Sequence, residues 1–357
     1  MKKTAIVLFN LGGPDKLDSV EPFLFNLFND KAIIAVPSPI RWLLARFIAK
    51  KRAPIARKIY ETLGGGSPLV RLTEKQSDAL VMLLNSKDQN HEFKAFIAMR
   101  YWHPMSLEAA EAVRAFAPDD VVLLPLYPQY SMTTTGSSLT EWQRAAAAAG
   151  INVPTHGVCC YPTNMGWISA QADLIGKALE TVEGDKQPRI LFSAHGLPKK
   201  IIAKGDPYQW QVEQTVSAVV KKLEGMGTRT FSSAICYQSR VGPLEWIGPS
   251  TEEELKNAGK ENVPVVVVPI AFVSEHSETL VELDVEYREL AQTLGVPAYH
   301  RVPAVGIHEK FIGGLAALVE AALKQPDDID LPRGRVDFGN KNRLCPVGQT
   351  QCALKSG

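Results

Sequence analysis

The stretch VPVVVVPIAFVSEHSETLVELDVEY, residues 263–287, joins an uninterrupted apolar run to a strongly acidic second half. A run of Val and Ile without a polar break is typical of a strand buried on both faces, as in a parallel sheet. The acidic half predicts a helix, because Glu278, Glu282 and Glu286 stand four residues apart and so share one helix face. Like charges at that spacing repel, at a cost of about a few tenths of a kcal/mol per pair. This cost indicates that the carboxylates have a function together.

Glu275 and His276 stand at the junction between the predicted strand and the predicted helix. In an open α/β sheet the carboxyl ends of the strands are where ligands bind. A row of carboxylates beside a histidine at that edge predicts a site for a metal cation or for proton transfer.

Strand-like and helix-like segments alternate along the whole chain, which predicts βαβ units and parallel sheets. A single (β/α)₈ barrel is disfavoured, because a long insertion separates the first two strands and a barrel spaces its helices more evenly. The order of elements repeats, so we predict an α/β fold of two similar Rossmann-like domains, each a four-stranded parallel sheet flanked by helices, with the active-site cleft between them. The predicted strands are 5–10, 93–99, 121–127, 153–160, 189–193, 230–236, 263–272 and 298–302. The predicted domains are 1–163 with the C-terminal helix 306–325, then 164–305 carrying the metal site, and finally a C-terminal extension over 326–357.

Composition excludes several classes of protein. The formal charge of +1 gives no reason to expect a nucleic-acid partner, and no apolar run approaches the length of a membrane-spanning helix. The apolar run near the N-terminus is short and ends in Gly-Gly-Pro-Asp, so we interpret it as a strand rather than a signal peptide. We therefore expect a cytoplasmic protein whose five cysteines do not form a disulfide framework.

The segment 31–58 contains eight basic residues and no acidic one, interleaved with Trp42, Phe47 and several Ile and Leu residues. A basic amphipathic segment of this kind is typical of a surface that lies on an anionic membrane, or of a lid over an apolar, anionic ligand. The alternative is a helix packed on its own domain with a solvated basic face.

Two further residues end predicted strands at the carboxyl edge. Arg100, followed by Tyr101, is placed to pair with a substrate carboxylate. His195 follows the strand RILFS and precedes a Gly-Leu-Pro turn. A histidine there is either functional or bonded to nearby backbone. The acidic row at the end of 263–272 favours the functional interpretation, because both strand ends open on the same edge.

Seven segments of this sequence, taken in their order along the chain, resemble the ferrochelatase family, whose members insert Fe²⁺ into a porphyrin. The resemblance implies two Rossmann-like domains with a porphyrin cleft, and a lip over 31–58 linked to porphyrin entry and membrane contact. The segments are FNLGGPD (9–15), GGGSPL (64–69), MRYWHP (99–104), LYPQYSMTTTGSS (126–138), SAHGLP (193–198), CYQSRVGPLEWIGPST (236–251) and AFVSEHSETLVELDVEY (271–287).

The resemblance also assigns roles residue by residue. It implies that His195 is the metal-site histidine and that Glu278 is the carboxylate facing it across the porphyrin. It assigns an acidic metal or proton path to Glu275, His276, Glu282 and Glu286. It assigns contacts with the porphyrin to Leu11, Tyr60, Ser67, Arg100, Tyr101 and Trp246.

The chemistry fits these residue types. Two pyrrole protons must leave the porphyrin as Fe²⁺, the second substrate, enters, so the site needs a proton acceptor such as a histidine of near-neutral pKa. Mixed N and O ligands suit a transient Fe²⁺ site. We expect protoporphyrin IX as the porphyrin and protohaem as the product, in the last step of haem biosynthesis. Alternatives are coproporphyrin III, another metal and tetrapyrrole pair, or a non-catalytic porphyrin or haem carrier. For the oligomeric state, a monomer and a homodimer are both alternatives. For the location, a peripheral position on the inner face of the membrane is an alternative.

Cys236 reads as a buried apolar residue, and the other four cysteines lie outside the seven segments. Some ferrochelatases hold a [2Fe–2S] cluster with one cysteine near the domain boundary and others in a C-terminal extension. The placement here resembles that pattern, but the tail has Leu354 near the place of a third cysteine. Four thiolates are usual for such a cluster, which leads us to expect one here. Its expected ligands are Cys159, Cys160, Cys345 and Cys352.

Overall fold

Two parallel sheets, each flanked by helices, organise the chain. The computed structural model describes residues 1–240, 244–324, 336–338 and 343–354. It divides into two compact units: unit 1 comprises Met1–Cys160 and parts of the chain from Leu315 on, and unit 2 comprises Tyr161–Gly314 and Cys345–Cys352. All strand pairs within the two sheets are parallel, which confirms the predicted α/β class. Much of the predicted extension 326–357 lies outside the described residues.

Within the described ranges, the sheet of unit 1 has five strands in the order β2-β1-β3-β4-β9. They are β1 (Lys2–Asn10), β2 (His91–Met99), β3 (Asp120–Pro125), β4 (Thr155–Gly157) and β9 (Val336–Asp337). The prediction of four strands was wrong for this sheet, because Val336 and Asp337 pair with Thr155 and His156 of β4. A two-residue strand in a polar tail has no periodic apolar pattern, so the sequence gives no signal for it.

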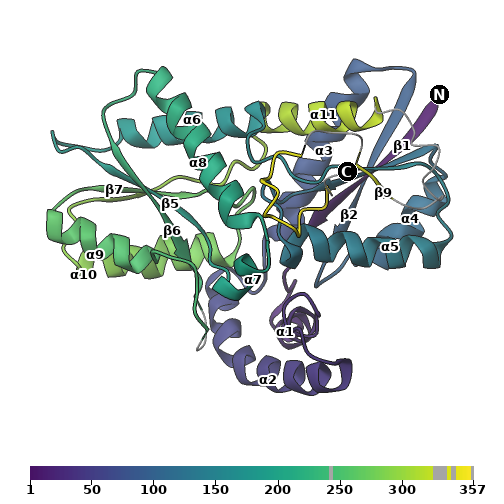
Figure 1. Cartoon of the computed structure of the whole chain (residues 1–357), viewed down its shortest axis with the longest axis horizontal. Coiled ribbons are helices and arrows are strands. Elements are labelled where there is room, and N and C mark those ends of the chain that lie inside the picture. Colours follow the sequence, from purple (N-terminus) through teal and green to yellow (C-terminus); the bar gives the residue numbers. More distant parts are fainter. Residues whose placement is uncertain (241–243, 325–335, 339–342, 355–357) are drawn as a thin grey trace. The chain divides into compact units, whose positions relative to one another are not determined.

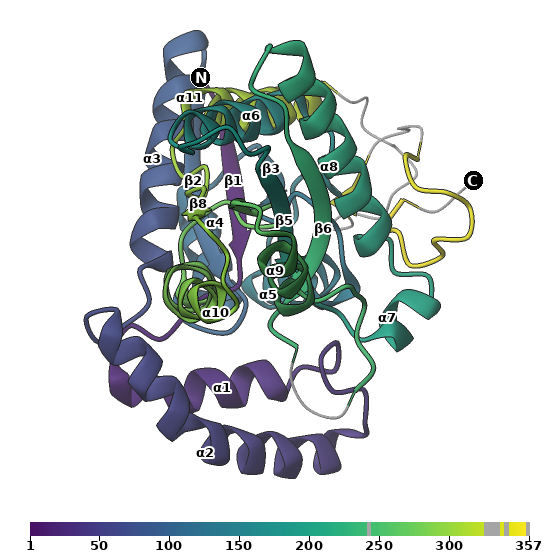
Figure 2. The same ribbon diagram turned by 90° about the vertical axis from the view of Figure 1, so that its left-hand side faces the viewer.

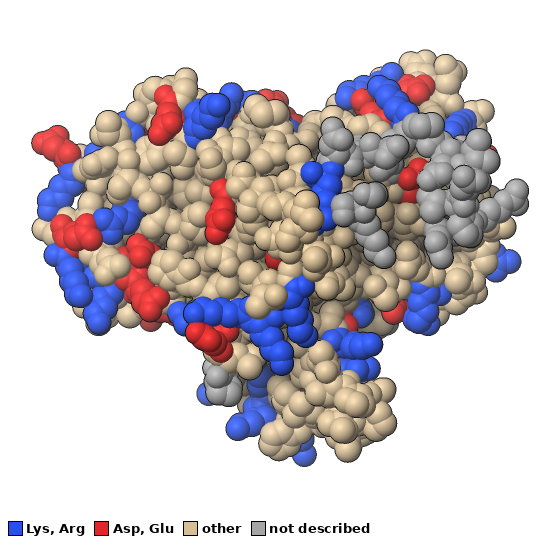
Figure 3. All heavy atoms as spheres, in the orientation of Figure 1, with Lys and Arg blue, Asp and Glu red and all other residues tan. Residues whose placement is uncertain are grey.

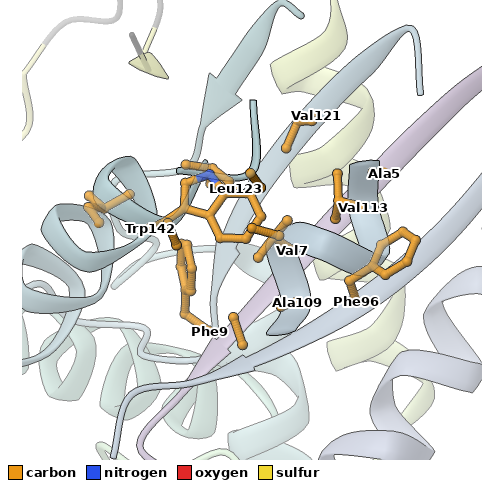
Figure 4. Close-up of a cluster of buried hydrophobic side chains, with 14 of the residues drawn as sticks. Ala5, Val7, Phe9, Phe96, Ala109, Val113, Val121, Leu123 and Trp142 are labelled. Atoms are coloured by element: carbon orange, nitrogen blue, oxygen red, sulfur yellow. The ribbon is translucent and has the colours of Figure 1, made fainter. Parts of the chain in front are cut away.

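One core cluster of unit 1 lies on one face of this sheet, where side chains of β1 and β3 meet helices α4 (Ser106–Phe116) and α5 (Ser137–Ala149). Figure 4 shows Val7, Phe9 and Leu123 gathered around Trp142, which is almost completely buried. The rings of Phe9 and Trp142 meet edge to face at 6.1 Å between centroids. The central strands can be apolar at every position because helices cover them.

The remaining helices of unit 1 precede β2 or follow β3. Helices α1 and α2 lie side by side, as Figure 2 shows, and α2 occupies most of the predicted basic segment 31–58. These elements are η1 (Leu17–Ser19), α1 (Val20–Phe28), α2 (Ser38–Thr62), α3 (Leu69–Lys87) and the π-turn η2 (Met132–Gly136). Helix α11 (Glu309–Leu323) runs across the division between the units.

The sheet of unit 2 has four strands in the order β6-β5-β7-β8, as predicted. Helices α9 and α10 lie on one face of this sheet, and α6 and α8 lie on the other (Figure 1). The strands are β5 (Arg189–His195), β6 (Ser232–Gln238), β7 (Val265–Pro269) and β8 (Tyr299–Arg301). The helices are α6 (Met165–Glu180), α7 (Lys199–Ala203), α8 (Tyr208–Gly225), α9 (Thr251–Glu261), the π-helix η3 (Glu278–Glu286) and α10 (Tyr287–Thr293).

The acidic stretch after β7 is helical as predicted, but its geometry differs from a regular α-helix. Residues Glu278–Glu286 form a π-helix, and only from Tyr287 on does the chain continue as the α-helix α10. A π-helix closes its hydrogen bonds over five residues instead of four, and such turns are rare and often occur at functional sites. Sequence periodicity cannot distinguish the two forms over nine residues, because carboxylates four apart share roughly one face in both.

Candidate active site

His195 and Glu278 form a close pair at the carboxyl edge of the sheet in unit 2. His195 is the last residue of β5, and Glu278 is the first residue of the π-helix η3 that follows β7. The distance between His195 Nδ1 and Glu278 Oε2 is 2.8 Å. The side chains are 40% and 26% exposed, so a ligand can reach them. The sequence-based expectation that these two strand ends open on one edge is met, because β5 and β7 are neighbours in the sheet.

Electrostatics favour the charged form of this pair. Burial raises the pKa of the Glu278 carboxyl, but the charge and hydrogen bond of His195 outweigh burial and lower it to about 2. Burial lowers the pKa of the His195 imidazole, but the Glu278 carboxylate outweighs this and raises it above its ordinary value. The carboxylate therefore holds the ring through Nδ1, so Nε2 is the nitrogen that is not used in this contact.

Ser239 joins Glu278 to a second carboxylate, that of Glu282. It follows β6 directly and has a φ of 61°, a left-handed backbone conformation that is uncommon outside glycine. Its hydroxyl donates to Glu278 Oε2 at 3.1 Å and also lies against Glu282 Oε2, while its backbone N–H donates to Glu282 Oε1 at 2.8 Å. Burial and the nearby charge of Glu278 raise the pKa of Glu282. The two carboxylates thus have opposite tendencies to hold a proton.

A hydrogen-bonded route leads from Glu282 to the protein surface. The hydroxyl of Tyr287 lies 3.1 Å from Glu282 Oε1 and 3.1 Å from Glu252 Oε1. Glu252 is exposed on the first turn of α9. Glu286, predicted to continue the path, is exposed and makes no hydrogen bond or ion pair with these groups within the described residues.

Glu275 and His276 are turned in other directions. Glu275 accepts two hydrogen bonds from Nη1 of Arg301, at 2.8 and 3.0 Å, so its carboxylate serves an internal ion pair. The His276 ring packs edge to face on Phe272, and its Nδ1 accepts from the backbone N–H of Glu278 at 3.0 Å. Burial lowers the pKa of His276, which favours this neutral acceptor form. Among the described residues, no group of three or more His, Cys, Asp or Glu side chains is arranged to hold a metal ion.

Trp246, predicted to contact the porphyrin, lies in unit 2 beside the turn that follows His195. Its backbone forms an isolated antiparallel bridge with Pro198. A methyl group on Gly196 would lie 3.4 Å from the Trp246 ring. Trp246 therefore packs against the SAHGLP segment.

Among the other predicted porphyrin contacts, which lie in unit 1, Arg100 and Tyr101 share one buried carboxylate. Asp30 Oδ2 accepts from Arg100 Nη2 and from the Tyr101 hydroxyl, both at 2.8 Å, and from the hydroxyl of Ser137. Arg100 Nε also donates to Ser137 Oγ at 2.7 Å. The charge of Arg100 is thus already paired within the protein, a feature that sequence reasoning missed because Asp30 lies in no recognisable pattern.

Leu11 and Ser67 belong to the two glycine-rich segments of unit 1, and Tyr60 lies just before the second. The Ser67 backbone N–H donates to Pro14 O at 2.7 Å, and a Cβ on Gly13 would lie 2.4 Å from Ser67 Oγ. Only glycine permits this approach. Leu11 and Tyr60 belong to the apolar cluster between α1 and α2. The segments FNLGGPD and GGGSPL therefore fold against each other.

The four cysteines predicted to hold a cluster are divided between the units. Cys159 and Cys160 belong to unit 1, and Cys345 and Cys352 belong to unit 2. Cys345 is buried, and Gln211 Nε2 donates to its sulfur at 3.1 Å. Within the described ranges no three of these thiols gather into a metal-binding group. No step proposed below depends on a cluster.

Solved structures with a similar arrangement define the class of the fold. SirB from Bacillus subtilis with Fe³⁺ aligns with a TM-score of 0.52 and 11% identity, covering 91% of this chain and 96% of that chain. The sirohydrochlorin chelatase SirB from Bacillus subtilis subspecies spizizenii in complex with cobalt aligns with a TM-score of 0.51 and 13% identity, covering 91% and 97%. These likenesses show that the chain has the two-domain fold of chelatases.

Sequence comparison narrows the class to one family. The family model described as Ferrochelatase matches residues 3–323. A relative named Ferrochelatase from Caulobacter vibrioides (strain NA1000 / CB15N) is 54% identical over 356 residues, covering 100% of this chain and 99% of the relative. A second, from Pelagibacter ubique (strain HTCC1062), is 50% identical over 317 residues, covering 89% and 90%. The chain belongs to the ferrochelatase family. The predicted recognition is confirmed, and with it the prediction of an enzyme, a lyase of the metal-chelatase class.

Proposed function

We propose that the His195–Glu278 pair is where Fe²⁺ enters the porphyrin and where the two pyrrole protons leave. The observation that carries this proposal is the 2.8 Å contact between the two side chains at an accessible sheet edge. Fe²⁺ is a substrate here, and the combination of imidazole nitrogen and carboxylate oxygen suits a metal that must bind and depart.

In this proposal His195 accepts pyrrole protons through Nε2. Glu278 fixes the ring through Nδ1 and stabilises the imidazolium that forms, in the manner of an oriented histidine base. Protonation of His195 converts the contact with Glu278 into a full ion pair, which favours proton removal from the macrocycle. The resemblance assigns the same two residues to the metal site.

The Nδ1 proton of the imidazolium then passes to Glu278, which returns His195 to its neutral form, and the proton leaves through Ser239, Glu282, Tyr287 and Glu252. Glu282 is suited to carry a proton because its pKa is raised by burial and by Glu278. The Tyr287 hydroxyl can receive a proton from Glu282 while it donates its own to Glu252, since it lies 3.1 Å from both. Glu252 is exposed and can release the proton to water.

Protoporphyrin IX is the porphyrin that we propose, with protohaem as product. Coproporphyrin III and a carrier without catalysis are the alternatives. The porphyrin contacts assigned to Leu11, Tyr60, Ser67, Arg100, Tyr101 and Trp246 remain predictions. If Arg100 contacts the porphyrin, it does so as a neutral Asp30–Arg100 pair, so it supplies a hydrogen bond more than a net charge.

Helix α2 supports contact with an anionic membrane. Ahead of Tyr60, the buried positions of α2 are small residues, Ala45, Ala49 and Ala53, and several large apolar side chains of this part of the helix are exposed. On the face shown in Figure 3, the part of the surface formed by α1 and α2 carries Lys and Arg among uncharged residues. The exposed apolar residues are Ile40, Trp42, Leu43, Leu44, Phe47 and Ile55.

Part of the basic charge of α2 serves internal contacts. Arg41 donates to the carbonyls of Asn29 and Val36, each at 2.8 Å, and Arg57 lies 3.6 Å from Glu21. Within the described ranges no helix is both long and apolar enough to span a bilayer. On the strength of the exposed apolar and basic residues of α2, we propose that the protein is cytoplasmic and meets the inner face of the membrane peripherally through 31–58.

The [2Fe–2S] cluster also remains a proposal, supported by the placement of Cys345 and Cys352 in the extension. Anaerobic purification followed by visible absorption and labile-sulfide analysis tests it. The absence of both signals in freshly prepared protein contradicts the cluster.

An anaerobic assay of Fe²⁺ insertion tests the function itself. Protoporphyrin IX and coproporphyrin III are offered separately, and loss of free-base fluorescence is followed against product absorption. We expect faster insertion into protoporphyrin IX. Preference for coproporphyrin III corrects the substrate, and tight binding of either porphyrin without insertion favours the carrier.

A further inference from the structure

Arg301, the last residue of the edge strand β8, uses all three of its guanidinium nitrogens on two carboxylates. Nη1 donates to both oxygens of Glu275 at 2.8 and 3.0 Å. Nε donates to Asp284 Oδ1 at 2.7 Å, and Nη2 lies 2.6 Å from Asp284 Oδ2. The Arg301 side chain is only 11% exposed. Glu275 precedes the π-helix η3 and Asp284 lies within it, so one side chain connects the residues before the wide turns to a residue inside them.

A continuous set of hydrogen bonds leads from this clamp to the reacting pair. The Thr279 hydroxyl donates to Glu275 and accepts from the backbone N–H of His276 at 3.0 Å. The Nδ1 atom of His276 accepts from the backbone N–H of Glu278 at 3.0 Å. Glu278 in turn meets His195. Ala304, just beyond β8, adds a backbone N–H to Glu275 Oε1 at 2.9 Å.

The physical reason for such a clamp lies in the π-helix. Wide turns of this kind are rare, because the closure over four residues of an α-helix is the usual alternative. A relaxation of η3 to α-helical closure would rotate Glu278 away from His195. Bidentate contacts between Arg and carboxylate are strong and directional, so a clamp that connects the residues before the turns to one inside them resists that rotation. Ion pairing raises the pKa of Arg301 and, with the Thr279 hydrogen bond, lowers that of Glu275 despite the burial of both groups, so the clamp stays charged.

We infer that Arg301 is a positioning residue for metal insertion, which holds the π-helix open through Glu275 and Asp284 and thereby keeps Glu278 opposite His195. In this role Glu275 is a structural partner of Arg301 and not a ligand on a metal path. The inference rests on the proposed roles of His195 and Glu278.

The test compares Arg301→Lys with Arg288→Gln in the full-length enzyme. Lysine keeps the charge but cannot hold two carboxylates bidentately. Arg288 is the matched control, because its Nη2 also lies 3.6 Å from Asp284 Oδ1 and its Nη1 donates to the β8 carbonyl of Tyr299, whereas it makes no contact with Glu275. The rate of Fe²⁺ insertion in a single turnover, the porphyrin Kd and the thermal midpoint are measured for each.

We expect Arg301→Lys to lower the insertion rate about 10- to 100-fold, the scale for misplacing a reacting group by about 1 Å, with an unchanged porphyrin Kd. Arg288→Gln should stay within about twofold of wild type, because the contacts of Arg288 with Asp284 and Tyr299 do not extend to Glu275. Equal rates for Arg301→Lys and wild type overturn the inference. So does a loss of porphyrin affinity in parallel with the loss of rate, which marks a general structural effect.

A second pair of variants covers the outcome in which Arg301→Lys fails to fold. Thr279→Val removes the hydroxyl between Glu275 and His276 at nearly constant volume, and Thr279→Ser keeps it. We expect Thr279→Val to insert Fe²⁺ more slowly than Thr279→Ser, at equal porphyrin Kd. Equal rates contradict the inference. A near-normal rate in His195→Ala instead contradicts the proposed function, so the two failures are distinguishable.

Discussion

The carboxylate of Glu278 lies 2.8 Å from the imidazole of His195 through Oε2 and Nδ1, although 83 residues separate them in the chain. The pairing arises because β5 and β7 are adjacent parallel strands, whose carboxyl ends therefore meet at one edge. Around this contact, Ser239, which follows β6, and Glu282 of η3 complete a hydrogen-bonded group. The proposed chemistry depends on that arrangement.

Glu278→Gln tests the carboxylate half of the pair. The amide retains the size of the side chain but cannot stabilise an imidazolium by charge. We expect the insertion rate to fall by about 10²-fold or more, within the range for a general acid–base group, while porphyrin still binds. Insertion is measured anaerobically, and Glu286→Gln serves as control, because Glu286 is exposed and lies outside the hydrogen-bonded group. A rate for Glu278→Gln equal to that of the control would show that the carboxylate is not needed.

The pH dependence follows from the raised pKa of His195. Since neutral imidazole is the proton acceptor, kcat/KM should rise with pH through this raised pKa and level off above it. Glu278→Gln removes the charge that raises the pKa, so the midpoint of His195 should move to lower pH. Titration of the His195 ring protons by NMR, assigned with His195→Asn, measures both midpoints. A midpoint that is the same in wild type and Glu278→Gln contradicts the proposed pairing.

The shifted pKa values of His195 and Glu278 also make the stability of the fold depend on pH. The folded-state pKa of His195 lies above its unfolded value, so its part of the pair stabilises the fold at lower pH and is lost as pH rises through the raised pKa. The Glu278 part is present above the ordinary carboxyl pKa and is lost as pH falls toward about 2. The pair is therefore most stabilising between these limits.

Tyr287→Phe tests the proton route to Glu252. Loss of the hydroxyl interrupts the connection between Glu282 and Glu252, so we expect a several-fold lower kcat at unchanged KM for porphyrin. Tyr299→Phe is the control, because it also removes a buried hydrogen bond, from the Tyr299 hydroxyl to Leu283 O at 2.6 Å, but touches no carboxylate. If both variants turn over at the wild-type rate, protons leave by another way.

Asp30→Ala tests the buried carboxylate in unit 1. The substitution leaves the largely buried Arg100 guanidinium without its ion pair, which should destabilise the fold by about 3–5 kcal/mol. Tyr101→Phe removes one hydrogen bond from the same carboxylate and should cost about 1 kcal/mol. Urea unfolding measures both, with the exposed residue Asp18 as the site of a control, Asp18→Ala. A loss no larger than that of the control would mean that Arg100 is not held by Asp30.

Leu43→Ser with Phe47→Ser tests the membrane contact of α2, where the two side chains are 64% and 66% exposed. We expect wild type to co-sediment with anionic vesicles at low salt and the double variant to bind more weakly. Met82→Ser, at an exposed position of α3, is the matched control. Equal sedimentation of all three proteins contradicts a role for α2 in membrane contact.

Much of this architecture is predictable from local pattern. The buried Val run 265–268 and the ends of β5 and β7 follow from apolar periodicity and from the geometry of parallel sheets, and these place His195 beside the acidic helix. The π form of η3 has no periodic signature. Asp30 and Arg301 act through contacts between elements far apart in the chain, which no local pattern encodes. Ser239 could have been predicted, because it directly follows β6 at the carboxyl edge of the sheet, the same criterion that identified His195.

The direction of the carboxylates was the least predictable part. Spacing put Glu275, Glu278, Glu282 and Glu286 in one row, but tertiary partners divide them. Glu275 is hydrogen-bonded to Arg301, and Glu278 is hydrogen-bonded to His195. Glu282 is hydrogen-bonded to Ser239 and Tyr287, whereas Glu286 is exposed. Which side chain meets which partner depends on the neighbouring strands, and these are fixed only once the sheet has formed.

The most direct test of the central claim is single-turnover insertion of Fe²⁺ by His195→Ala with porphyrin already bound. The claim predicts that the variant binds porphyrin as wild type does, shown by an unchanged Kd and fluorescence spectrum, while free-base porphyrin persists after Fe²⁺ is added. Insertion at a rate near that of wild type would contradict the assignment of the His195–Glu278 pair as the site of metal entry.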